Sequence, residues 1–214
     1  ALAGRDILWD QNNEYNLRLR KVLEKILREY RGDRETGEFQ AFLTYAKKVF
    51  FANGMHHHYS MEKFIPEFTP EFFRSLLLAV GEETAFGELK RVMFDPEYMA
   101  KRVVLDDGKD IVQASANNYY EGVTQKEVED FYREKKKQND LISWGLNSTL
   151  IRDEEGRLKE DVWHVGGKYS KELTRVVENL EKATEYACNE HQKTVMDSLI
   201  QYYKTGDLSL FDQY

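Results

Sequence analysis

Residues 38–54 read EFQAFLTYAKKVFFANG, and this stretch sets the expectation of a helical fold. Apolar side chains recur in it at intervals of three and four, as they do on one face of an α-helix. The members of this stripe are Phe39, Phe42, Leu43, Ala46, Val49 and Phe50. Asn53-Gly54 then supplies a stop signal. The stretch therefore predicts a helix over about 38–52 that buries an aromatic face.

The same periodicity extends outward from this helix in both directions. A preceding helix is expected from about Tyr15 to Gly32, and two more are expected at 70–80, after the Thr69-Pro70 start signal, and at 84–93. Thr124 and Glu127 form a capping box for a helix through Lys137. A last helix, capped by Ser170, is expected to run unbroken over 170–205, on the order of 50 Å long.

Short extended segments are predicted only in the middle of the chain. The segments 102–105 and 111–115 read as strands on either side of a turn, and 144–152 and 157–165 read as a hairpin across Asp153-Glu154-Glu155-Gly156. The expected fold class is α+β, mainly α-helical. One fragment, 1–214, is expected to be helical over 1–100, mixed over 101–168 and a long helix over 170–205, with no linker that would split it.

Composition excludes several classes of protein. The 214 residues include 31 Lys and Arg against 38 Asp and Glu, a net charge of −7, which argues against a nucleic-acid partner. One cysteine, Cys188, excludes an internal disulfide. No apolar run approaches the roughly 20 residues of a membrane-spanning helix, so we expect a soluble protein without a membrane partner. The start ALAG and the apolar end suggest cuts within a longer protein, and a cytoplasmic location is favoured, with periplasmic or secreted ones left open.

Candidate chemistry is sparse. His56-His57-His58 lies in the loop 53–64, but no Asp or Cys stands at ligand spacing beside it, so a polar, ligand-facing loop is favoured over a metal site. Cys188 and His191 stand three apart on the expected last helix and are interpreted as packing residues, and His164 is interpreted as a surface or cleft residue. No HExxH-type, GxSxG or phosphate-loop motif is present. We therefore expect no catalytic residue and no metal ligand in this chain.

Four stretches in the same order resemble the dipeptidyl peptidase III family of zinc-dependent exopeptidases. EFQAFLTYA at 38–46 looks like a helix of that family and is followed at matching distance by Asn53-Gly54 and by KFIP at 63–66. EGVT at 121–124 is similar to a family turn. VVENLEKA at 176–183, followed by Tyr186-Ala187 and His191-Gln192, resembles a family helix.

The resemblance implies a two-lobed enzyme that releases dipeptides from the N-termini of oligopeptides. It places this chain in the N-terminal lobe that carries no zinc, and zinc itself on residues outside the chain. An aromatic residue five positions after the loop glycine lines a substrate pocket in the family, and Tyr59 holds that position here. The resemblance thus implies substrate binding by Tyr59, with Asn53, Gly54 and His58 beside it, an oligopeptide and the remaining lobe as partners, and an inactive isolated fragment.

Three alternatives stay open. Tyr59 could be a partly buried aromatic that staples the loop onto a helix. The chain could be a non-enzymatic helical interaction domain whose long last helix, 170–205, docks a partner. A metal protein built on His56, His57 and His58 is the third.

Overall fold

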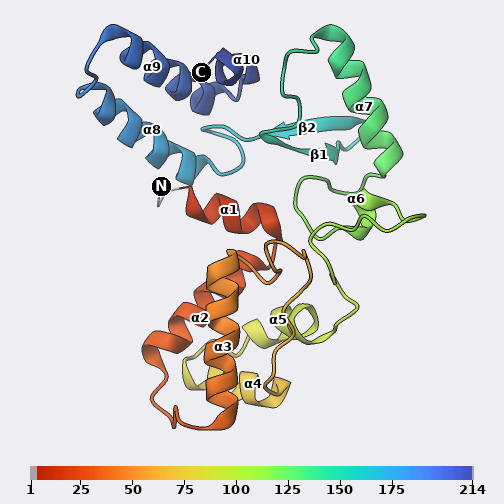
Figure 1. Ribbon diagram of the computed structural model, residues 1–214, viewed down its shortest axis with the longest axis vertical. Helices are drawn as coiled ribbons and strands as arrows, with labels where there is room; N and C mark the ends of the chain where they lie inside the picture. The colour runs from red at the N-terminus through yellow and green to blue at the C-terminus, as the bar shows by residue number, and fades with distance from the viewer. Residues whose placement is uncertain (1–3, 214) are drawn as a thin grey trace. The chain divides into compact units, whose positions relative to one another are not determined.

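The structure, a computed structural model, describes residues 4–213 and divides the chain into two compact units (Figure 1). We call Leu8–Asn118 the bundle unit, and the described residues of Ala1–Ile7 and Tyr119–Tyr214 the hairpin unit. The sequence carries no linker signal at this boundary. The predicted fold class is confirmed, because helices dominate and one antiparallel hairpin accompanies them.

The bundle unit consists of helices joined by loops. Its main helices are α2 (Asn16–Glu29), α3 (Gly37–Ala52), α4 (Pro70–Ala79) and α5 (Ala85–Phe94), and it also holds the four-residue α6 (Ile111–Ala114). Helix α1 (Arg5–Asn12), which the sequence analysis did not predict, begins just before the unit. Thr69 caps α4, since its hydroxyl accepts the amide N–H of Phe72 and Pro70 takes the first helical position.

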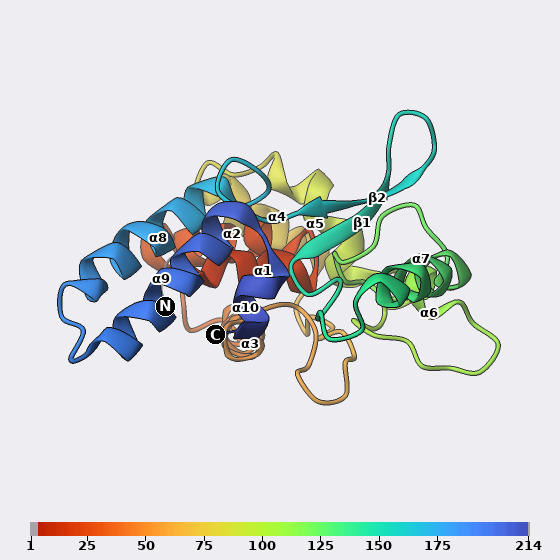
Figure 2. The ribbon, with the colours of Figure 1, turned by 90° about the horizontal axis from the view of Figure 1, so that it is seen from above.

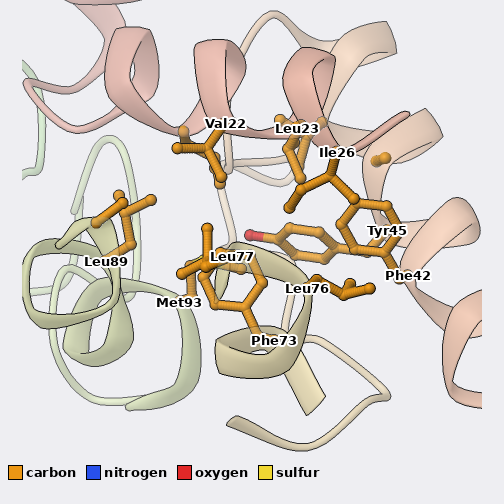
Figure 3. Packing of buried hydrophobic residues seen from close by; sticks show 14 of the residues in the cluster. Val22, Leu23, Ile26, Phe42, Tyr45, Phe73, Leu76, Leu77, Leu89 and Met93 are labelled. Carbon is orange, nitrogen blue, oxygen red and sulfur yellow. The ribbon is translucent and has the colours of Figure 1, made fainter. Parts of the chain in front are cut away.

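The aromatic stripe predicted for α3 forms the centre of the bundle core. Phe39 and Phe42 are fully buried, and leucines from α2 and α4 pack against them (Figure 3). Tyr45 reaches into the same cluster, where Figure 3 shows its hydroxyl among apolar side chains. Within residues 4–213 that hydroxyl has no hydrogen-bond partner, and burial raises the pKa of Tyr45.

The hairpin unit is built on two strands, β1 (Ser148–Arg152) and β2 (Leu158–Val162), paired from Ser148 opposite Val162 to Arg152 opposite Leu158. This confirms the predicted hairpin. Helix α7 (Gln125–Gln138) starts at the predicted capping box, in which the Thr124 hydroxyl and the Glu127 carboxylate each accept a backbone N–H.

The predicted single helix over 170–205 is wrong, because the chain forms two helices there. These are α8 (Ser170–Thr184) and α9 (Glu190–Thr205), and they pack side by side (Figures 1 and 2). Asn189 is extended, and its side chain accepts the N–H of Gln192, so a new helix begins with a cap of its own. Ser170 is not the cap predicted for this region: Tyr169 precedes α8, and the Ser170 hydroxyl accepts the N–H of Gly166.

The strands predicted at 102–105 and 111–115 are also absent from the described chain. Residues 111–114 form α6 instead, because the Asp110 carboxylate accepts the N–H groups of Val112 and Gln113 and so starts a helix. In the first segment the amide of Val104 donates to the Ser115 hydroxyl, a contact that is no strand ladder. The remaining helix, α10 (Leu208–Gln213), follows α9 directly. None of the helices within 4–213 has the length and apolarity that crossing a membrane requires.

Candidate functional site

The loop 53–64 is visible after α3 in Figure 2. It begins with Asn53 and Gly54, whose backbone conformations favour these two residue types. Asn53 is left-handed, with φ of 54°, and ends α3. At Gly54 an added Cβ would lie 2.5 Å from Nδ2 of Asn16, a fully buried residue. The Asn16 side chain accepts the N–H of Met55 at 3.1 Å and donates to the carbonyl of Trp9 at 3.2 Å. Asn53 and Gly54 therefore fix where the loop leaves the bundle.

His56 and Lys63 form the buried base of the loop, where they pair in an isolated antiparallel bridge. Nε2 of His56 donates to the carbonyl of Met99 at 2.8 Å, and Nδ1 has no partner within the described residues. Burial lowers the pKa of His56 to about 4, helped by the positive charges of Lys63 and Arg102. His56 is thus a neutral structural residue and does not face a ligand.

The tip of the loop is a tight turn organised by His57. Nδ1 of His57 accepts the amides of Tyr59 and Ser60, each at 3.2 Å, and its backbone bonds with Glu62 and Met61 close the turn. A ring nitrogen that accepts amide N–H groups carries no proton, so the N–H of this ring is on Nε2. The next two side chains, of His58 and Tyr59, stand at the tip.

Five rings come together where α3 ends and the loop begins, and we call them the aromatic group: Phe51, His57, His58, Tyr59 and Phe64. The rings of His58 and Tyr59 lie 4.3 Å apart between centroids, and those of His57 and His58 lie 4.8 Å apart and are stacked. Phe51, in the last turn of α3, meets His58 edge-on at 5.3 Å. Tyr59 is 82% exposed and Phe51 is 78% exposed. The exposed rings form a flat aromatic surface with polar ring atoms, and this surface is available to a partner molecule.

The structure treats the four predicted site residues differently. It brings Tyr59 and His58 together in the aromatic group, whereas Asn53 and Gly54 shape the backbone below it. The sequence did not predict Phe51 and Phe64 as members of the aromatic group. Phe51 falls outside the apolar stripe of its helix, and that departure from the stripe is the signal in the sequence that marks it as exposed.

The loop does not fit a metal ion. Among residues 4–213 no group of three or more His, Cys, Asp or Glu side chains could hold one. Nδ1 of His57 accepts backbone amides, and Nε2 of His56 donates to the carbonyl of Met99. A zinc ion therefore finds no ligand set in this loop.

The packing roles predicted for Cys188 and His191 are wrong, because both residues are exposed. Cys188 is exposed in the connection between α8 and α9, and His191 is exposed in the first turn of α9. The break between α8 and α9 places Cys188 outside any helix. His164 lies half-buried just beyond β2, where Nδ1 contacts the carbonyl of Val165 at 2.8 Å.

Comparison with known proteins finds a match to a protein family. The sequence profile of peptidase family M49, the family of dipeptidyl peptidase III, matches residues 146–214, which is less than half of the chain. The matched segment covers the hairpin and the helices that follow it, while the aromatic group lies outside it. No curated protein matches the chain.

The match supports a peptidase of family M49, and with it a hydrolase of the metallopeptidase class that acts on a peptide substrate.

Proposed function

We propose that this chain is the N-terminal, substrate-binding lobe of a dipeptidyl peptidase III-like enzyme, and that the aromatic group holds the first residues of an oligopeptide. One observation carries the assignment of the loop: Tyr59 is 82% exposed at the tip of a turn whose base is buried and hydrogen-bonded. An aromatic that stapled the loop onto a helix would be covered, so the alternative role for Tyr59 is not favoured.

The role of this chain in the proposed reaction is binding and positioning. The face of Tyr59 would pack against an apolar peptide side chain, and its hydroxyl would donate to a peptide carbonyl. His58, stacked beside it, adds a second flat surface. Asn53 and Gly54 would act on the substrate indirectly, by fixing the backbone where the loop leaves α3. Residues outside this chain would bind zinc, and the zinc would supply an activated water. The isolated chain would therefore be inactive.

A test in the complete enzyme separates binding from metal chemistry. Tyr59→Ala should raise KM for short peptides by about tenfold while zinc content stays unchanged. Tyr186→Ala is the matched control, because Tyr186 is 81% exposed but lies between α8 and α9. Unchanged kinetics for Tyr59→Ala, or equal effects of both substitutions, would refute the assignment.

The proposal that the isolated chain is inactive has its own test. Purified residues 1–214 should release no dipeptide from a diarginyl reporter, and release above background would show that the chain is active by itself. The competing interaction-domain hypothesis relied on an unbroken last helix, which the structure replaces with α8 and α9. A cytoplasmic location stays a prediction.

A further inference from the structure

The hairpin unit contains a pocket that the proposed function does not use. Its volume is about 430 Å³, within the range of small-molecule sites. Its walls come from the end of α7, the segment 138–147, β2 and the turn between α9 and α10. All of these lie in the same unit.

Side-chain and backbone contacts hold the walls in place. The backbone N–H and hydroxyl of Ser143 donate to the Asp212 carboxylate at 3.1 and 2.9 Å, which ties the segment 138–147 to α10. Asn147 donates to the carbonyl of Gly206 at 2.9 Å. Gly206 has a φ of 74°, and a Cβ there would lie 2.4 Å from Cγ1 of Val162. The close approach of this turn to β2 thus defines one wall of the pocket.

One side of the pocket is cationic and aromatic. The ammonium of Lys135 lies 4.9 Å from the ring centroid of Trp144 and 3.2 Å from the carboxylate of Glu160. Glu160 also accepts the hydroxyls of Ser148 at 2.9 Å and Tyr132 at 3.2 Å, so both of its carboxylate oxygens have partners. Lys135 has three N–H donors, and within residues 4–213 Glu160 is its only ion-pair partner. Donors therefore remain for an anionic group of a ligand.

The rim formed by the turn between α9 and α10 is anionic. Oδ1 of Asp207 accepts both the amide and the hydroxyl of Ser209, at 2.9 and 2.7 Å. Oδ2 has no partner within the described chain, and Asp207 is exposed. The lining also includes the apolar side chains of Ile142, Trp144, Val162 and Leu208 and the amide side chains of Gln138, Asn139 and Asn147. A cation, an anion and an apolar wall in one small pocket match a zwitterion with a bulky side chain.

We propose that this pocket binds a free amino acid or short peptide, with its carboxylate on Lys135, its ammonium on Asp207 and an apolar side chain against Trp144. This is a second site, and it does not rest on the role proposed for the aromatic group.

The test titrates the ¹⁵N-labelled chain with three probes and follows the indole N–H signal of Trp144, which is identified by its loss in Trp144→Phe. L-phenylalanine carries both charges, N-acetyl-L-phenylalanine lacks the ammonium, and L-phenylalaninamide lacks the carboxylate. We expect L-phenylalanine to shift the signal saturably, and each derivative to bind about tenfold more weakly, because each loses one charge-assisted contact. No saturable shift, or equal affinity for the three probes, would overturn the proposal.

A variant locates the ammonium. Asp207→Asn keeps the shape and the acceptor for Ser209, so it should weaken L-phenylalanine about tenfold and leave N-acetyl-L-phenylalanine unchanged. Asp197→Asn, at an exposed carboxylate on α9, is the matched control and should leave both probes unchanged. If Asp207→Asn does not alter the affinity for L-phenylalanine, the ammonium is not bound there and the proposed site is refuted.

Discussion

Gly54→Ala should destabilise the bundle unit by about 3 kcal/mol. The new Cβ would stand 2.5 Å from Nδ2 of Asn16 and 3.0 Å from its Cγ, so the buried Asn16 side chain must move. That movement breaks its bonds to the Met55 amide and the Trp9 carbonyl, at about 1 kcal/mol each. The φ of 153° at Gly54 is also unfavourable for a residue with a Cβ and costs about 1 kcal/mol more.

Native-state hydrogen exchange measures this loss within the unit concerned. The slowest amides of α3 report the free energy of opening the bundle, and they should exchange faster by a factor that corresponds to about 3 kcal/mol. Thermal unfolding of the unit should shift down by on the order of 10 °C.

Two companion variants test the physical reason. Gly87→Ala is the control, because Gly87 lies in α5 and an added Cβ would have nothing within 4 Å. This substitution should stabilise the protein by about 0.5–1 kcal/mol. In an Asn16→Ala background the contact and both bonds are already absent, so Gly54→Ala should cost about 1 kcal/mol. A loss below about 1 kcal/mol in the unaltered background, or full additivity with Asn16→Ala, would refute the reasoning.

Three further predictions concern single side chains. In the folded protein the pKa of His56 is lowered to about 4 from an ordinary value of 6.5. As the pH falls, the unfolded chain therefore takes up the proton before the folded chain does. The free energy of unfolding should fall by about 3 kcal/mol between pH 6.5 and pH 4. His56→Gln should flatten that decline in urea titrations, whereas His191→Gln, at an exposed site, should not; parallel curves for all three proteins would exclude His56 as the cause. Cys188 is exposed and should react fully with a thiol reagent in the native protein, and reaction only after denaturation would contradict its placement between α8 and α9. Tyr45→Phe removes an unpartnered buried hydroxyl and should raise stability by about 1 kcal/mol, and a loss of stability would reveal a hydrogen bond at that hydroxyl.

The sequence predicted local structure wherever a local cause dominates. The helix over 38–52, the Thr69-Pro70 start, the capping box at Thr124 and the hairpin all depend on contacts within a few residues, and all four are confirmed. The errors arose where two local signals compete. Asn189 offers a helix cap inside a helix-period stretch, and Asp110 offers one immediately before the segment 111–115 that reads as a strand.

The candidate site depends on contacts that no spacing in the sequence records. A run of three histidines gives three identical letters, yet the fold buries His56 against Met99, uses His57 to hold a turn and leaves His58 beside Tyr59. The pocket in the hairpin unit likewise joins Lys135, Trp144 and Asp207 from three separate segments. The sequence alone determined the helical class and the hairpin, because periodicity and turn residues act locally. Only the tertiary structure decided which side chains meet, because burial and hydrogen-bond pairing depend on residues far apart in the chain.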